Sequence, residues 1–487
     1  MSKINTYKDS AKGITVFGGI QVYKMLLSVI RTKCSAIFLG PMGFGIYSLI
    51  SSTLTSIEMV TNCGLGTSAV KDIAESSSDN KVVSRTYILL NRLVWGTGVA
   101  ATLFCAFGAK WLSILAFGND EYTWMFVIGS VSLLLNQLIS GQGALMSGLR
   151  KYKYIVRLNL WTNMISLIIT ILFYWLWGVK AIIAVILSSS AINLIFSAYY
   201  ARKIQLEKVI VTIKDTFSKG KGMIKMGIFI SLSGALTALG GYAIRIYISN
   251  TSDIATVGLF TAVFSLINTY LGLAFTSIEK DYFPRLSSIA KDSIKFETTI
   301  RQQNEILLHI LAPLVTVFMV FAPLLLKVFY SSKFVDATGM MSVTVWAMFY
   351  KIPSWTLTIG FLSKGDTKTY FKSNMSFAIY SLLLNIAGFY LWGLKGIGVS
   401  YIIAYIIFMF QTYIISKRRY GFSFGKSVWG IIALYSLLLL LTCFVADASD
   451  MYIKYGIGSI MVITISFIGI KELNKRLSII NLLKRKK

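Results

Sequence analysis

Residues 159–200 read NLWTNMISLIITILFYWLWGVKAIIAVILSSSAINLIFSAYY, and the architecture of the chain can be worked out from this stretch. Two apolar runs, each long enough to cross roughly 30 Å of hydrocarbon as a helix, are separated only by Trp177-Gly178-Val179-Lys180. An aromatic and a basic residue at the ends of apolar runs are typical of a membrane–water interface. The stretch therefore predicts two antiparallel membrane-spanning helices joined by a tight turn.

Similar apolar runs continue along almost the whole chain. The 487 residues are 55% apolar and 14% charged, with a mean hydropathy of +0.68, which is more apolar material than a soluble core could bury. The first run carries Lys24 and Arg31 and lacks a small-residue cleavage site, so we interpret it as a retained helix and not a signal peptide. We predict fourteen spans, near 14–39, 44–68, 87–108, 122–146, 155–176, 181–201, 224–248, 255–279, 303–329, 338–362, 372–392, 396–416, 428–446 and 452–470.

The net charge of +28 comes from basic residues that gather in loops on one side of these spans. In a soluble protein such a charge would suggest a nucleic-acid partner, but here the distribution follows the positive-inside rule, and no nucleic acid is expected. The basic clusters are Arg150 to Lys153, the 202–225 loop, Lys280 to Arg301, Lys417 to Arg419, and Lys471 to Lys487. Both termini are therefore expected in the cytoplasm.

The two halves of the chain repeat each other. Asn159 and Trp177-Gly178-Val179-Lys180 recur as Asn374 and Trp392-Gly393-Leu394-Lys395, at the same offset along the chain. Each half holds six spans, an even number, so the halves share one topology. We predict an all-α integral membrane protein of about 14 helices, with two pseudo-symmetric six-helix lobes around a central cavity and two C-terminal helices. The alternative is that Trp-Gly-x-Lys is only a recurrent interfacial turn.

These repeats set the expected domain limits. The N-lobe is 1–201, a cytoplasmic inter-lobe loop is 202–223, the C-lobe is 224–416, and 417–487 holds the two additional spans and a basic cytoplasmic tail.

Several short motifs resemble the polysaccharide transporter family. They are Leu39-Gly40-Pro41-Met42-Gly43-Phe44-Gly45-Ile46-Tyr47, Gly64-Leu65-Gly66 leading into Lys71-Asp72-Ile73-Ala74, Asp281-Tyr282-Phe283-Pro284-Arg285-Leu286, and Tyr330-Ser331-Ser332-Lys333-Phe334. The chain resembles the O-antigen and enterobacterial-common-antigen translocases over roughly residues 10–416, within the superfamily of multidrug and oligosaccharidyl-lipid exporters. The segments at 428–446 and 452–470 depart from the usual twelve spans and bring the helix count nearer to that of the lipid II flippases.

This resemblance implies a flippase of the bacterial inner (plasma) membrane. Its substrate would be an undecaprenyl-diphosphate-linked oligosaccharide, such as an O-antigen repeat unit, moved from the cytoplasmic to the periplasmic leaflet by alternating access. An O-antigen polymerase and a chain-length regulator are the partners that the family implies for lipopolysaccharide biosynthesis. The direction of transport could come from H⁺, Na⁺ or downstream polymerisation, and no cofactor is expected.

Four cations lie deep within the predicted spans: Lys24, Arg31, Arg245 and Lys351. A charge at mid-bilayer costs roughly 2.5–3.5 kcal/mol, so each requires a partner or a water-filled cavity. Lys24 and Arg31 are two helical turns apart and share one face. Arginine binds phosphate oxygens bidentately, so these cations are our candidates for binding the diphosphate. The alternative for the arginines is pairing with helix carbonyls or with Glu58.

Glu58 is the only carboxylate at that depth and is assigned either as a counter-ion or as a coupling group. The single histidine, His309, is expected to be a hydrogen-bonded residue between helices. The four cysteines show no metal-ligand spacing, and no metal or catalytic site is predicted.

Two competing functions follow from the same residues. A multidrug exporter for cationic drugs would favour carboxylates in its cavity, whereas the deep charges here are mainly cationic. An integral-membrane acyltransferase would require a His/Asp pair at the membrane face, and His309 has no plausible acidic partner for such chemistry. A membrane glycosyltransferase or polymerase would require a large outer loop, and the outer loops are short, so the chain is not expected to be an enzyme.

Overall fold

The computed structural model describes residues 3–448 and 450–477, and the side chains of this range other than those of 3–22, 213–222, 225–226, 229–233, 237 and 477. Within these residues every regular element is a helix, which confirms the all-α class. The chain divides into two compact units, Met1–Gly258 and Leu259–Lys487. The lobe limits expected from the repeat stay predictions, and residues 478–487 of the expected basic tail lie outside the described part.

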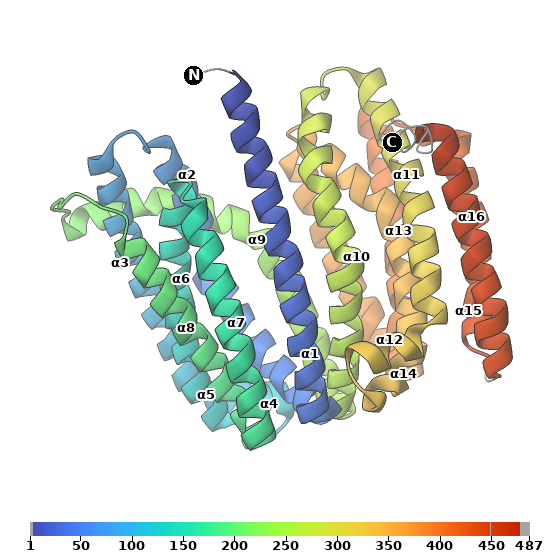
Figure 1. Cartoon of the computed structure of the whole chain (residues 1–487), viewed down its shortest axis with the longest axis horizontal. Helices are drawn as coiled ribbons and strands as arrows, with labels where there is room; N and C mark the ends of the chain where they lie inside the picture. Colours follow the sequence, from blue (N-terminus) through green and yellow to red (C-terminus); the bar gives the residue numbers. More distant parts are fainter. Residues whose placement is uncertain (1–2, 449, 478–487) are drawn as a thin grey trace. The chain divides into compact units, whose positions relative to one another are not determined.

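The first unit is built from helices joined by short connections, except for the longer segment 203–212 between α8 and α9 (Figure 1). They are α1 (Lys3–Thr61), α2 (Leu65–Glu75), α3 (Asn80–Phe107), α4 (Ala109–Phe117), α5 (Thr123–Gly129), α6 (Val131–Gly148), α7 (Tyr152–Trp177), α8 (Ile182–Arg202) and α9 (Ile213–Thr251). Helix α9 packs against α1, α2, α3 and α4 and so belongs to this unit.

The second unit contains the remaining helices. They are α10 (Ile254–Ser288), which starts in the last residues of the first unit, α11 (Ser293–Val320), α12 (Ala322–Phe329), α13 (Thr338–Ser363), α14 (Thr367–Tyr420), α15 (Gly425–Ala446) and α16 (Gly458–Leu477). Within this unit α13 packs against α11 and α14, and both α15 and α16 pack against α11.

Among the described residues, nine helical segments are long and apolar enough to cross a membrane. They are Tyr23–Thr61, Asn80–Phe107, Thr123–Gly148, Tyr152–Arg202, Ile254–Ser288, Ser293–Val320, Thr367–Tyr420, Gly425–Ala446 and Ile453–Arg476. Three of these segments contain a break and match two expected spans each: Tyr23–Thr61, Tyr152–Arg202 and Thr367–Tyr420. The nine segments together therefore match twelve of the fourteen expected spans. The remaining two expected spans, 224–248 and 338–362, coincide with α9 and α13. The chain is a multi-pass membrane protein.

Each break contains a glycine that lies in the short gap between two expected spans. Gly40 has φ 63° and ψ −175° within α1. Trp177 (φ −124°, ψ 0°) is followed by Gly178 (φ 53°, ψ −129°), and Trp392 (φ −139°, ψ 20°) by Gly393 (φ 59°, ψ −142°). L-residues rarely adopt a positive φ with such ψ values, so glycine is required there. The repeated Trp-Gly pair therefore has one backbone conformation in both halves.

A second repeated feature was not foreseen from the sequence. Helices α3 and α11 are both 28 residues long, and each begins after an aspartate, Asp79 or Asp292, whose side chain accepts backbone N–H groups of the first turn. The N–H of Lys295 holds the pKa of Asp292 below its usual value. Each long helix is followed by a short one, α4 or α12. The halves thus share local structure beyond the matched motifs.

The two C-terminal helices lie beside α11 and pack against it (Figure 1). Arg476 of α16 forms an ion pair with Glu305 of α11. A Cβ on Gly469 would lie 2.6 Å from the carbonyl oxygen of His309, so glycine lets α16 approach closely. His309 Nδ1 lies 2.8 Å from the hydroxyl oxygen of Tyr435 on α15, which confirms the expected hydrogen-bonded histidine between helices.

Candidate functional site

The candidate cations and the carboxylate lie on four helical segments. Lys24 and Arg31 are on α1 before its break at Gly40, and Glu58 is on α1 after it. Arg245 is on α9, so these four residues all belong to the first unit. Lys351 is on α13 in the second unit. Within the described part of the first unit, no ion pair joins Glu58 to Lys24 or Arg31.

Arg31 is a half-buried arginine at the contact between α1 and α7. Its Nη2 donates to the carbonyl oxygen of Asn163 at 3.3 Å, and the nearby Tyr23 hydroxyl donates to the carbonyl oxygen of Leu160 at 3.2 Å. The Nε of Arg31 is buried and has no hydrogen-bond partner among the described residues. A guanidinium carries five N–H donors, so Arg31 has capacity for an acceptor that the described chain does not supply.

Arg245 connects α9 to the part of α1 that follows the break. Its Nε donates to Ser48 Oγ at 2.9 Å, and its Nη1 donates to the carbonyl oxygen of Gly241 at 2.6 Å. A Cβ on Gly241 would lie 3.3 Å from Nη1, so the glycine leaves room for the guanidinium. Arg31 and Arg245 therefore both make contacts that involve α1, on opposite sides of its break.

Glu58 is held by an amide and not by a cation in the described part of the chain. Asn136 Nδ2 on α6 donates to Glu58 Oε2 at 3.1 Å, and Ser190 Oγ on α8 donates to Asn136 Oδ1 at 3.1 Å. This chain of hydrogen bonds links α1, α6 and α8. Asn136 and Ser190 were not foreseen from the sequence, because an uncharged polar side chain in an apolar helix gives no signal until its neighbours are known.

The two lysines differ in their surroundings. Lys24 is half-buried, and none of the ion pairs among the described residues includes it. Lys351 Nζ lies 5.0 Å from the centre of the Phe275 ring, a cation–π contact. The Phe275 ring in turn packs edge-on against the Trp355 ring, with 5.4 Å between the ring centres. Phe275 and Trp355 were not among the sequence-predicted site residues.

Among the candidate residues, Arg31 and Arg245 donate to neutral oxygens, and Lys351 contacts an aromatic ring. Glu58 accepts a hydrogen bond from an amide. Spare guanidinium donors in a low-dielectric setting favour an anionic ligand, and phosphate oxygens match their geometry. Among the described residues no group of three or more His, Cys, Asp or Glu could hold a metal ion. The roles assigned to Arg31, Arg245, Lys24, Lys351 and Glu58 stay predictions.

Solved structures similar to this chain share its fold at low sequence identity. An inward-facing multidrug resistance MATE family transporter of the MOP superfamily matches with a TM-score of 0.71 and 14% identity, over 82% of this chain and 94% of that one. The lipid II flippase MurJ, in an inward closed conformation, also matches with a TM-score of 0.71 and 14% identity, over 95% of this chain and 98% of its own.

A MOP superfamily transporter from Pyrococcus furiosus, described by the reverse polarity of its binding pocket, matches with a TM-score of 0.52 and 14% identity, over 80% of this chain and 98% of that one. No curated protein sequence matches this chain significantly.

A family model agrees with the motifs quoted from the sequence. The model for polysaccharide biosynthesis proteins matches residues 10–290, which include the motifs at Leu39–Tyr47, Gly64–Ala74 and Asp281–Leu286. The family resemblance is therefore confirmed, and the fold is that of the MATE and MurJ transporters. Since the match covers more than half of its length, the chain belongs to the polysaccharide biosynthesis protein family.

Proposed function

We propose that this protein is a flippase that moves an undecaprenyl-diphosphate-linked oligosaccharide, such as an O-antigen repeat unit, across the bacterial inner membrane by alternating access. The substrate would enter from the cytoplasmic leaflet and leave into the periplasmic one. The family match and the likeness in fold to a lipid II flippase support a lipid-linked substrate. The basic loops support an orientation with both termini in the cytoplasm.

This proposal rests mainly on the incomplete hydrogen bonding of the Arg31 guanidinium. Its guanidinium lies in a membrane-spanning helix, donates to one backbone carbonyl oxygen, and has a buried Nε without a partner among the described residues. A charged donor in the membrane is costly unless its hydrogen bonds are completed. A diphosphate supplies several anionic oxygens, so it would complete the hydrogen bonding of this arginine during transport.

The test replaces Arg31 and Arg245, one at a time, by alanine and by lysine in a host whose surface polysaccharide depends on this protein. The matched control is Arg157→Ala, because Arg157 is an exposed arginine on α7, the helix that Arg31 contacts. Charged hydrogen bonds contribute about 1.5–3 kcal/mol, so we expect export to fall by about tenfold or more in the alanine variants.

Membrane abundance is measured for every variant alongside export. Accumulation of the lipid-linked intermediate in the cytoplasmic leaflet at normal abundance supports the proposal, as does export by Arg157→Ala at the wild-type level. Normal export in all variants of both arginines would assign them structural roles and contradict the diphosphate-binding site.

The second candidate is a multidrug exporter, favoured by the equally high TM-score to a MATE transporter. A pocket for cationic drugs would place carboxylates, not arginines and lysines, within the spans. In the Pyrococcus furiosus relative, reverse polarity of the binding pocket is what suggests a different function. We therefore prefer the anionic substrate, and an unchanged sensitivity to cationic drugs when the gene is deleted is the expected result.

A further inference from the structure

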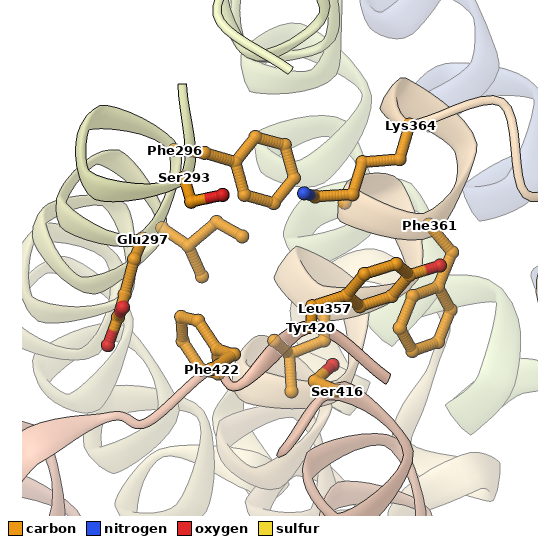
Figure 2. A pocket seen from close by; sticks show the side chains of 11 residues that line it. Ser293, Phe296, Glu297, Leu357, Phe361, Lys364, Ser416, Tyr420 and Phe422 are labelled. Atoms are coloured by element: carbon orange, nitrogen blue, oxygen red, sulfur yellow. The ribbon is translucent and has the colours of Figure 1, made fainter. Parts of the chain in front are cut away.

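A pocket of about 350 Å³, its open mouth included, lies among the ends of α11, α13 and α14 within the second unit (Figure 2). Its walls are mostly apolar and aromatic, with Phe296, Leu357, Phe361 and Phe422 among them. A Cβ on Gly360 would lie 3.3 Å from Ile300 Cδ1 and 3.5 Å from Phe296 Cζ, so the glycine keeps this side of the pocket open.

Lys364 is the cation of this pocket. Figure 2 shows its side chain extending into the opening toward Phe296. Its Nζ lies 4.5 Å from the centre of the Phe296 ring and 4.9 Å from that of Tyr420, so two cation–π contacts fix the position of the charge. An ordered cation loses little side-chain entropy when it binds an anion.

The other charges around the pocket are already paired. Glu297 forms an ion pair with Arg301 and accepts the backbone N–H of Ser423 at 3.2 Å. Asp366 forms an ion pair with Arg419 at 2.7 Å. None of the ion pairs in the described part of the chain includes Lys364. The local charge balance therefore leaves one positive charge without an anion.

The pocket lies where helices end. Ser293 is the first residue of α11, Lys364 directly follows α13, and Tyr420 is the last residue of α14. Both α11 and α14 are membrane-spanning segments, so their ends lie near the level of lipid headgroups. Lysine and tyrosine at this level are well placed to meet a phosphate that is attached to apolar chains.

We propose that this pocket binds one anionic membrane phospholipid, whose phosphate pairs with Lys364 and whose glycerol and upper acyl chain lie against Leu357 and Phe361. The apolar walls favour a lipid over a free phosphate ion, which could not use them. A zwitterionic lipid would bring no net charge to the unpaired lysine. The residues of this pocket belong to the second unit, whereas Arg31 and Arg245 belong to the first, and this proposal does not depend on the proposed transport function.

The test counts and titrates lipids bound to the purified full chain by native mass spectrometry. Dioleoyl phosphatidylglycerol is compared with dioleoyl phosphatidylcholine for the wild type, Lys364→Gln and Lys364→Arg. The matched control is Lys368→Gln, because Lys368 is an exposed lysine near the start of α14 on the same end of the unit. Inorganic phosphate is added as a competitor in a separate series.

We expect the wild type to retain one phosphatidylglycerol in preference to phosphatidylcholine. Lys364→Gln should weaken phosphatidylglycerol binding about fivefold, the effect of one cation on an acidic lipid, while Lys364→Arg and Lys368→Gln remain within about twofold of the wild type. Equal losses in Lys364→Gln and Lys368→Gln, or no loss in Lys364→Gln, would overturn the proposal. Displacement of the lipid by millimolar inorganic phosphate would assign the pocket to a free anion and overturn it too.

Discussion

Replacing Gly393 by alanine tests whether the repeated turn requires glycine. Gly393 has φ 59° and ψ −142°, a conformation that costs a residue with a Cβ roughly 1–3 kcal/mol. No heavy atom outside the local backbone lies within 4 Å of a Cβ built there, so a steric clash adds nothing to this cost. The expected loss of stability is therefore the backbone cost alone, and Gly178→Ala should lose a similar amount because its backbone matches.

The assay is thermal unfolding of the purified protein in detergent at one fixed scan rate. About 1 kcal/mol lowers Tm by roughly 2–4 °C in a unit of this size, so Gly393→Ala should unfold several degrees below the wild type. The matched control is Gly430→Ala on α15, where a Cβ also meets nothing within 4 Å but the backbone is helical. Alanine there should raise stability by up to about 1 kcal/mol. A Gly393→Ala protein that unfolds at or above the wild-type temperature would refute the argument.

Three further perturbations follow from single contacts. Asn136→Leu removes the hydrogen-bond donor to Glu58 and should destabilise the first unit by about 1–3 kcal/mol, measured by the same unfolding assay; an unchanged Tm would contradict the contact. A double-mutant cycle of Glu305→Gln and Arg476→Gln should give a coupling of about 1 kcal/mol, since both side chains are partly buried, and additive effects would argue against the ion pair. Burial opposes the ionisation of Asp366, but hydrogen bonds from Tyr420 and Thr369 and the charge of Arg419 outweigh it and hold its pKa below the usual value. The ionised Asp366 should therefore contribute its full stabilisation above about pH 5, and this contribution should disappear as the pH falls through the lowered pKa. The Tm of Asp366→Asn should be below that of the wild type at neutral pH, and the two Tm values should converge in acid.

Much of the fold could be predicted because the membrane reduces the problem to apolar length and loop charge. The gap between the expected spans 14–39 and 44–68 coincides with the observed break at Gly40, and the expected turns at Trp177–Lys180 and Trp392–Lys395 coincide with the other two breaks. The short helices α2, α4 and α12 were not foreseen, since segments of 8 to 11 residues are too short to give a membrane signal. For the same reason, the expected span 44–68 includes the first residues of α2.

The candidate site could be predicted only in part. Charge and depth were enough to single out Arg31, Arg245 and Glu58, because an ionisable group within a span is rare and costly. Their partners could not be predicted, since Asn163, Ser48 and Asn136 approach them only through the packing of helices distant in sequence. The aromatic neighbours of Lys351 were hidden for the same reason, and because aromatic residues are abundant throughout the chain.

We propose that this protein carries a diphosphate-linked lipid from one leaflet to the other. The most direct test reconstitutes the purified protein into vesicles that carry a polyprenyl-diphosphate-linked oligosaccharide, and measures how much of it becomes accessible on the opposite face. We predict transfer above that of protein-free vesicles, with Arg31→Ala close to the protein-free level and Arg157→Ala close to the wild type. Transfer no faster than in protein-free vesicles would contradict the proposed function, and equal transfer by the wild type and Arg31→Ala would contradict the role proposed for Arg31.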